Sequence, residues 1–123
     1  MKKVLVVEDD QMLLGMYQKI LTKHGYQVKT ATDGETGLRL ALADHPDLIL
    51  LDIRMPKMDG MTVLHHLRAD KWGKRVLVII LTNLDMNDER LAAITIDQPS
   101  YYLIKADNPP KQVLEKINKV LDN

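Results

Sequence analysis

The chain has 123 residues, 46% of them hydrophobic, which is enough for one domain with a single core. Its 17 basic and 17 acidic residues cancel, so no basic surplus argues for nucleic-acid binding. It has no cysteine, which excludes a disulfide framework and thiol catalysis. No apolar run approaches the roughly 18 residues of a membrane span. The apolar stretch near the start, Val4–Val7, is too short for the roughly 7–15 residues of a signal-peptide core. We expect a cytoplasmic protein with a single domain over residues 1–123.

The first third of the chain predicts a strand, a helix and a second strand. The apolar run Lys2–Val7 is the first strand. A helix should follow, because apolar residues recur at helical spacing at Leu13, Leu14, Tyr17, Ile20 and Leu21. It should stop near Gly25, a residue typical of the position just past a helix end. Gln27–Ala31 has fewer apolar residues, so we place this strand at a sheet edge.

The middle of the chain predicts two more helix–strand units. After an Asp33-Gly34 turn, a second helix carries Leu38, Ala41 and Leu42 and ends before Pro46. The strand Leu48–Leu51 follows. A third helix begins near Gly60 and buries Val63, Leu64 and Leu67.

The last third begins with the most apolar strand, Val76–Leu81. A fourth helix is expected within Asp85–Ile96, and a fifth strand at Tyr101–Ile104. A fifth helix has Pro110 near its first turn, where a missing N–H is tolerated. Its apolar face consists of Val113, Ile117, Val120 and Leu121.

Three of these strands are apolar at nearly every position rather than at alternate ones. That pattern is typical of parallel strands covered by helices on both faces. Five such units predict an α/β fold with a doubly wound sheet. The first and third strands should flank the point where the winding reverses, which would bring Asp9 beside Asp52.

Polar residues stand at the ends of four strands, and parallel strands deliver them to one edge of the sheet. They are Glu8-Asp9-Asp10, Asp52, Thr82-Asn83 and Lys105. Two groups of acids, a hydroxyl and an amine at one edge form an array suited to binding a divalent metal and receiving a phosphoryl group. A strand-end aspartate followed by a Pro/Gly-rich turn, as at Asp52, is the most informative of these features.

The pattern resembles a bacterial two-component response-regulator receiver domain over essentially the whole chain. The matching elements are Val7-Glu8-Asp9-Asp10, Leu51-Asp52-Ile53-Arg54-Met55-Pro56-Lys57-Met58-Asp59-Gly60, Leu81-Thr82-Asn83 and Tyr102-Leu103-Ile104-Lys105. The resemblance implies a flavodoxin-like fold, with five parallel strands in the order 2-1-3-4-5 and five helices. It also implies a phosphoacceptor switch, which is not an enzyme beyond its own phosphorylation and dephosphorylation.

The same resemblance implies a Mg²⁺ site. Asp52 and Asp9 would be the direct ligands, Glu8 would act mostly through water, and the backbone carbonyl of Arg54 would complete the set. The chemistry asks for such a site independently, because a carboxylate and a phosphorylated donor are both anionic. A hard, octahedral cation bridging them would neutralise their repulsion.

The remaining implied roles concern the phosphoryl group and the switch. Asp52 would receive phosphoryl from a sensor histidine kinase or a phosphotransfer protein. Thr82 and Lys105 would contact the phosphoryl oxygens. Thr82 and Tyr102 would form the switch, altering a face made by the fourth helix, fifth strand and fifth helix. A downstream effector protein or domain would read that face, with no direct nucleic-acid or membrane contact.

The sequence also departs from the family pattern. Ala106 replaces the proline that usually follows the lysine in a cis bond, and a cis bond without proline costs about 2.5–4 kcal/mol. Gln98-Pro99 replaces the usual Gly-Ala before the fifth strand. Asn83 stands where a small residue is frequent, and Arg54 and Leu84 occupy positions that affect the lifetime of the phosphorylated state.

Three alternatives remain open from the residues alone. Asp10 is either a helix cap or part of the metal site. The domain is either a phosphorylated switch or an interaction module whose switch is damaged near Lys105. An aspartyl-phosphate phosphatase would carry a second acid two residues after the nucleophile, where this chain has Arg54. Nucleotide binding is disfavoured, because neither glycine-rich phosphate motif is present.

Overall fold

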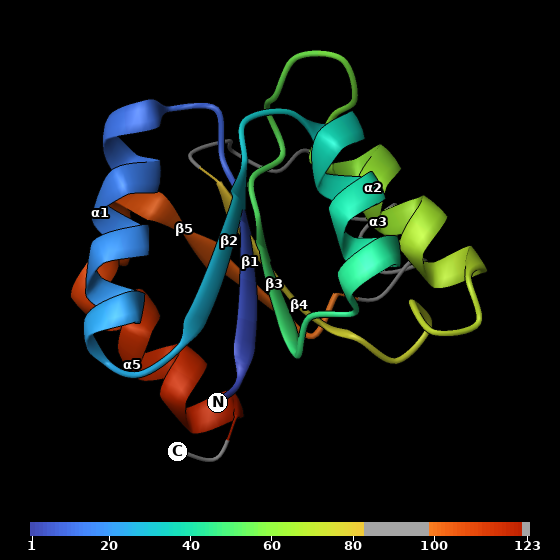
Figure 1. Cartoon of the computed structure of the whole chain (residues 1–123). Helices are drawn as coiled ribbons and strands as arrows, with labels where there is room; N and C mark the ends of the chain where they lie inside the picture. The colour runs from blue at the N-terminus through green and yellow to red at the C-terminus, as the bar shows by residue number, and fades with distance from the viewer. Residues whose placement is uncertain (83–98, 122–123) are drawn as a thin grey trace.

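Five parallel strands form one sheet in the order β2-β1-β3-β4-β5 (Figure 1). The computed structural model describes residues 1–82 and 99–121. The strands are β1 (Lys3–Val7), β2 (Gln27–Ala31), β3 (Leu48–Leu51), β4 (Leu77–Thr82) and β5 (Tyr101–Ile104). The predicted strand order is confirmed, with β2 at an edge. β1 and β4 each begin one residue later than their apolar runs suggested.

Helices cover both faces of the sheet. They are α1 (Gln11–Lys23), α2 (Gly34–Asp44), α3 (Gly60–Ala69), α5 (Pro110–Val120) and the short 3-10 helix η1 (Lys105–Asp107). α1 and α5 lie on one side and α2 and α3 on the other (Figure 1). The helix expected within Asp85–Ile96 lies outside the described residues, so the five-helix count stays a prediction.

Each face of the sheet has its own hydrophobic core, because successive strand residues point to opposite faces. Facing α1 and α5 are Val4, Val6, Leu48, Leu50, Ile79 and Leu81. Facing α2 and α3 are Leu5, Val7, Ile49, Leu51, Val78 and Ile80. Burial on both faces explains why β1, β3 and β4 are continuous apolar runs in the sequence.

The helix faces follow the predicted spacing with one error. Val63, Leu64 and Leu67 are buried on α3, as predicted. Leu42, expected on the inner face of α2, is exposed to solvent, so that prediction is wrong. The buried residues of α2 are Gly34, Gly37 and Ala41. Leu42 follows Ala41 by one residue, which rotates its side chain by about 100° around the helix axis and away from the core.

Two predicted helix boundaries are confirmed, one at a glycine and one at a proline. α1 ends at Lys23, and Gly25 adopts a left-handed φ of 91° just beyond it, a conformation that favours glycine. Pro110 is the first residue of α5. None of the helices in the described part of the chain has the length and apolar content needed to cross a bilayer.

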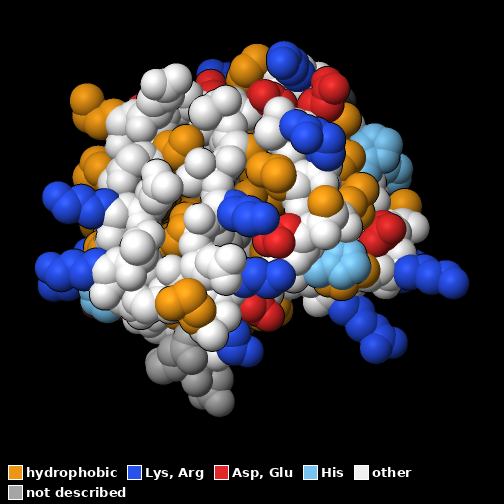
Figure 2. Space-filling view, in the orientation of Figure 1, with side chains coloured by type: hydrophobic (Ala, Val, Ile, Leu, Met, Phe, Trp, Pro, Cys, Tyr) orange, Lys and Arg blue, Asp and Glu red, His pale blue; other side chains and the backbone are white. Residues whose placement is uncertain are grey.

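The visible surface carries both signs of charge. Figure 2 shows basic and acidic side chains interspersed over this face, in the orientation of Figure 1. The mixture agrees with the balanced composition of the chain.

Candidate functional site

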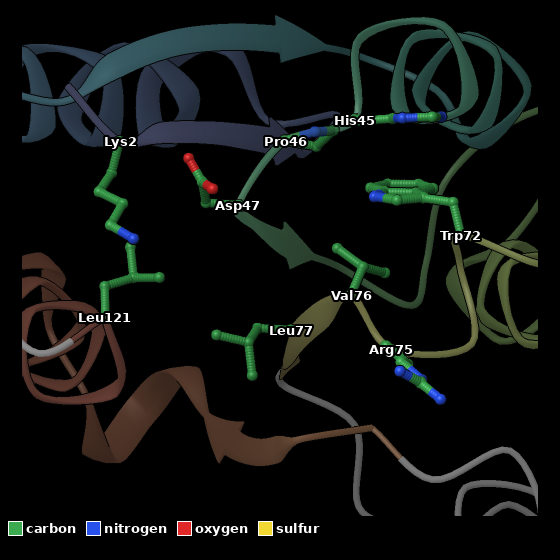
Figure 3. Close-up of a pocket in the computed structure, with 9 residues that line it drawn as sticks. All are labelled: Lys2, His45, Pro46, Asp47, Trp72, Arg75, Val76, Leu77 and Leu121. Atoms are coloured by element: carbon green, nitrogen blue, oxygen red, sulfur yellow. The ribbon is translucent and has the colours of Figure 1, made fainter.

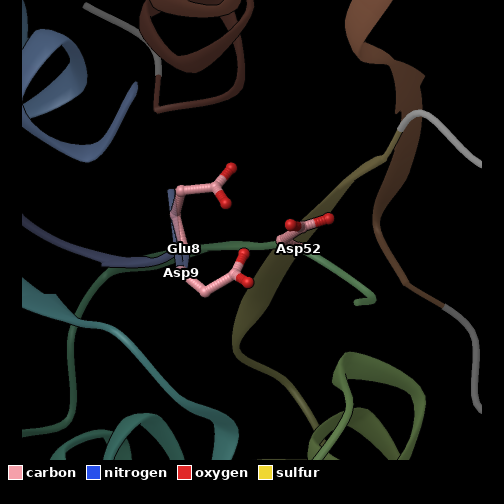
Figure 4. A group of neighbouring side chains, drawn as sticks. All are labelled: Glu8, Asp9 and Asp52. Atoms are coloured by element: carbon pink, nitrogen blue, oxygen red, sulfur yellow. The ribbon is translucent and has the colours of Figure 1, made fainter. Parts of the chain in front are cut away.

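The ends of β1 and β3 place three carboxylates side by side. β1 pairs with β3 so that Val7 lies opposite Leu51, and the amide of Asp52 donates to the carbonyl of Val7 at 3.0 Å. Glu8, Asp9 and Asp52 each present a carboxylate oxygen, and these three atoms lie within 4.8 Å of one another (Figure 4). The predicted neighbourhood of Asp9 and Asp52 is therefore confirmed.

Lys105 brings a positive charge into the same cluster from the end of β5. Its Nζ lies 2.5 Å from Oε1 of Glu8 and 3.1 Å from Oδ2 of Asp52. None of the described peptide bonds is cis, so the Lys105–Ala106 bond is trans, and η1 begins at Lys105. Replacing the usual proline by alanine therefore leaves this lysine within reach of both acids.

Burial and ion pairing have opposing effects on the pKa values of Glu8 and Lys105, the two groups that pair most closely. Glu8 is 2% exposed, and this burial raises its pKa from 4.5 to about 7 despite the hydrogen bonds from Lys105 and Asp10. For Lys105, burial opposes the charge. The hydrogen bond to Glu8 and the charges of Asp52 and Glu8 outweigh it, so the pKa of the lysine is raised.

Asp9 and Asp10 have different surroundings. Asp9 is exposed, and within residues 1–82 and 99–121 its carboxylate has no hydrogen-bond or ion-pair partner. Asp10 caps α1, because its Oδ1 accepts from the amides of Met12 at 3.0 Å and Leu13 at 3.3 Å. Asp10 is not a member of the carboxylate cluster. The structure therefore favours the capping role for Asp10 and leaves Asp9 open to a ligand.

Asp52 is held in a defined orientation. It is 6% exposed; its Oδ1 accepts from the amide of Ile53 at 2.8 Å, and its Oδ2 accepts from Lys105. A carboxylate has about four lone-pair positions, so both oxygens retain acceptor capacity. The group is buried, oriented and still able to bind a cation or to act as a nucleophile.

The other predicted site residues lie around this cluster. Thr82 is buried at the end of β4, which neighbours β3. Tyr102 is half-buried on β5 and packs against the core on the α2 and α3 side. Arg54 lies two residues beyond Asp52, with an exposed side chain. Asn83 and Leu84 lie outside the described residues.

The donor set fits a hard divalent cation. Three carboxylates supply oxygen ligands, which Mg²⁺ prefers, and the exposed position of Asp9 leaves room for the waters that Mg²⁺ retains. Lys105 balances one of the three negative charges. A bound cation would reduce the remaining repulsion.

Two features of this edge were missed by sequence reasoning. One is the direct Glu8–Lys105 ion pair, which joins residues 97 positions apart. The other is the role of Asp59, which caps α3 by accepting from the amide of Thr62 at 2.8 Å. For the second, an aspartate directly before the predicted helix start at Gly60 was an available signal.

A separate pocket of about 340 Å³ lies at the other end of the strands, where β1, β3 and β4 begin (Figure 3). Its lining includes the start of β4 and the stacked rings of His45 and Trp72, whose centroids are 4.4 Å apart. All four histidines are exposed, and His45 stacks on Trp72. None of the acids of the cluster lines this pocket. We therefore assign it no part in phosphoryl chemistry.

Comparison with known proteins connects this geometry to a family. A model of the response regulator receiver domain matches residues 4–118. PhoP of Bacillus subtilis, an alkaline phosphatase synthesis transcriptional regulatory protein, is 33% identical over 120 residues, which is 98% of this chain. The chain spans 48% of PhoP and between 20% and 52% of the length of the curated relatives it matches.

Solved structures show the same fold. A CheY-like receiver domain protein of Methanospirillum hungatei superposes with a TM-score of 0.88 at 30% identity, covering 99% of this chain and 94% of that one. The Mn²⁺-bound form of response regulator Rcp1 superposes with a TM-score of 0.81 at 26% identity, covering 96% and 92%.

Proposed function

The chain belongs to the response regulator receiver domain family, and we propose that it is a phosphoacceptor switch that receives a phosphoryl group on Asp52 in a Mg²⁺-dependent reaction. The observation that carries the proposal is the cluster at one sheet edge, in which Lys105 contacts Asp52 while Glu8 and Asp9 flank it. Residues 1–123 would then act as a single receiver domain.

The chemical step suits the placement of Asp52. One of its carboxylate oxygens forms a bond to the phosphorus of a phosphohistidine donor. The bond from phosphorus to the imidazole nitrogen of that histidine breaks. The imidazole leaves with that electron pair. Lys105, 3.1 Å from Asp52, supplies positive charge beside the developing acyl phosphate, and Thr82 offers a hydroxyl at the end of the neighbouring strand.

Glu8, Asp9, Asp52 and the carbonyl of Arg54 would hold the metal. Bound Mg²⁺ would supply positive charge that offsets the repulsion of the carboxylate and the phosphoryl group. The carboxylate cluster supports this assignment, as does the Mn²⁺-bound form of the similar regulator Rcp1. Asp9 is the best placed ligand, since it is exposed and its carboxylate has no partner in the described ranges.

The signalling role concerns β5 and its neighbours. A sensor histidine kinase or phosphotransfer protein would supply the phosphoryl group, and an effector protein or domain would read the face formed by the fourth helix, β5 and α5. The position of Thr82 supports this route, because Thr82 pairs with Ile104 and Ile80 pairs with Tyr102 across the β4–β5 boundary. A change at Thr82 would thus reach β5 directly.

Arg54, two residues after the proposed acceptor Asp52, argues against a hydrolytic enzyme. An aspartyl-phosphate phosphatase would place an acid there, and this chain has Arg54. Arginine remains protonated in proteins and cannot act as a general base.

The test is intact mass after incubation with Mg²⁺ and acetyl phosphate. Wild type should gain one phosphoryl group, and Asp52→Asn should gain none, because an amide is a far weaker nucleophile than a carboxylate. Asp59→Asn is the matched control, since Asp59 lies in the same loop but caps α3. It should be labelled like wild type.

Two outcomes would contradict the proposal. Equal labelling of wild type and Asp52→Asn would exclude Asp52 as the acceptor. No labelling of the folded wild type, with acetyl phosphate or a panel of phosphorylated histidine kinases, would favour the alternative of a non-phosphorylated interaction module.

A further inference from the structure

The loop that follows Asp52 is a closed unit. It comprises residues 53–59, between the end of β3 and the start of α3. The amide of Gly60 donates to the carbonyl of Ile53 at 2.8 Å, which ties the two ends of the loop together. Within it, the amide of Met58 donates to the carbonyl of Pro56 at 2.8 Å. The position of Arg54 therefore depends on how this loop is held as a whole.

The first turn of α2 approaches this loop most closely at Gly34, opposite the backbone carbonyl of Met58. A Cβ added to Gly34 would lie 1.8 Å from the carbonyl oxygen of Met58 and 2.7 Å from its carbonyl carbon. Neither atom can be moved by rotating a side chain, so any residue larger than glycine must displace either the helix or the loop. Figure 1 shows the loop beside this end of α2.

A weaker electrostatic influence acts between the same two segments. Asp33 caps α2 by accepting from the amide of Thr36 at 2.7 Å. The pKa of Asp33 is lowered mainly by that hydrogen bond, and the positive charge of Lys57 lowers it further. Lys57 belongs to the loop and adopts a left-handed φ of 69°. The positive charge of Lys57 in the loop therefore favours the ionised form of the carboxylate that caps α2.

We propose that Gly34 is a positioning residue, through which α2 holds the β3–α3 loop where Asp52 and Arg54 act on one metal ion. The inference rests on the proposed function. It gives the site a support on the side of the sheet opposite α1 and α5. A partner that displaced α2 would change the metal affinity without touching β5.

The test compares two glycines that meet a backbone carbonyl in the same way. Gly73 is buried in the turn after α3, and a Cβ there would lie 2.1 Å from the carbonyl oxygen of Leu67. Gly34→Ala and Gly73→Ala should both lower stability in urea denaturation. Only Gly34→Ala should weaken Mg²⁺ binding, by about tenfold, which is typical when the support of a metal ligand is disturbed. Amide signals of residues 53–60 in the metal-free protein should shift in Gly34→Ala alone.

The outcomes separate this inference from the proposed function. A wild type that does not bind Mg²⁺ contradicts the proposed function, and the metal-free amide signals then still decide whether Gly34 positions the loop. A wild type that binds Mg²⁺, together with equal affinity in folded Gly34→Ala, overturns the inference alone.

A second variant covers the case in which Gly34→Ala does not fold. Asp33→Ala removes the cap of α2 and its attraction to Lys57 without adding bulk at the contact. A weaker Mg²⁺ affinity in folded Asp33→Ala would support the inference. An affinity equal to that of wild type would overturn it.

Discussion

The residue with the most unusual environment is Glu8, a buried acid that shares Lys105 with Asp52. Its Oε1 pairs with Lys105, and its Oε2 accepts from the amide of Asp10 at 3.1 Å. Even with these partners, burial raises the pKa of Glu8 to about 7. Ionisation of Glu8 therefore lowers the stability of the folded protein relative to the unfolded chain.

We predict that Glu8→Gln gains stability relative to wild type as the pH rises from about 4.5 to about 7 in metal-free protein. Between these values the unfolded chain has lost the Glu8 proton while the folded protein keeps it, so the free energy of unfolding of wild type falls with rising pH. Glutamine does not titrate and escapes this loss. Urea denaturation at several pH values, with a chelator present, measures the difference.

The control for this prediction is Glu115→Gln, which changes an exposed glutamate on α5. It should keep the pH profile of wild type. A constant stability difference between Glu8→Gln and wild type across this range would mean that burial does not disfavour the Glu8 charge.

At the scale of elements, three α-helices begin beside the site with an aspartate cap. Asp10, Asp33 and Asp59 cap α1, α2 and α3, respectively. The three caps fix the helix ends next to Glu8 and Asp52. The acidic character of this sheet edge therefore has two sources, carboxylates that cap helices and carboxylates that converge on Lys105.

The cap of α3 gives a prediction at this scale. Asp59→Ala should lower the free energy of unfolding by about 1 kcal/mol, because the amide of Thr62 loses its acceptor. Asp59→Asn should cost much less, since asparagine caps a helix almost as well. Thermal or urea denaturation distinguishes the two. Equal losses would show that the charge of Asp59, rather than its hydrogen bond, stabilises α3.

At the scale of the whole molecule, the site and the proposed output face are joined by the β4–β5 pairing. Thr82 at the end of β4 pairs with Ile104, directly before Lys105. On the outer side of β5, the Nζ of Lys116 lies 3.9 Å from the ring centre of Tyr101, which links β5 to α5. A movement at Thr82 therefore has a short physical path to β5 and α5.

We predict that beryllofluoride with Mg²⁺, a mimic of the phosphoryl group, shifts the amide signals of residues 101–106. Thr82→Ala should reduce these shifts while Asp52 stays occupied, because the hydroxyl that would contact the phosphoryl oxygens is removed. Ser100→Ala is the control, since Ser100 bonds Val78 at the other end of the same strand pair. Shifts confined to the neighbours of Asp52 in wild type would contradict the switch.

The strand order of the sheet and the gathering of acids and a lysine at one of its edges could be predicted from the sequence. Continuous apolar runs at β1, β3 and β4 require burial on both faces, and parallel strands bring Asp9, Asp52 and Lys105 to one edge. These conclusions depend only on the period of the pattern and on strand direction, which a sequence displays directly. The prediction for Leu42 failed, because a helical pattern does not fix the inner face of a helix to within one residue.

The pairing of the site residues, in contrast, depends on the tertiary structure. Glu8 and Asp9 are adjacent in the chain, yet Glu8 is buried against Lys105 and Asp9 faces solvent. The approach of Gly34 to the carbonyl of Met58 is likewise invisible in the sequence. Such contacts join distant segments at distances that a shift of 1 Å would abolish. They depend on how helices and loops pack on the finished sheet, and no local pattern of residues records that packing.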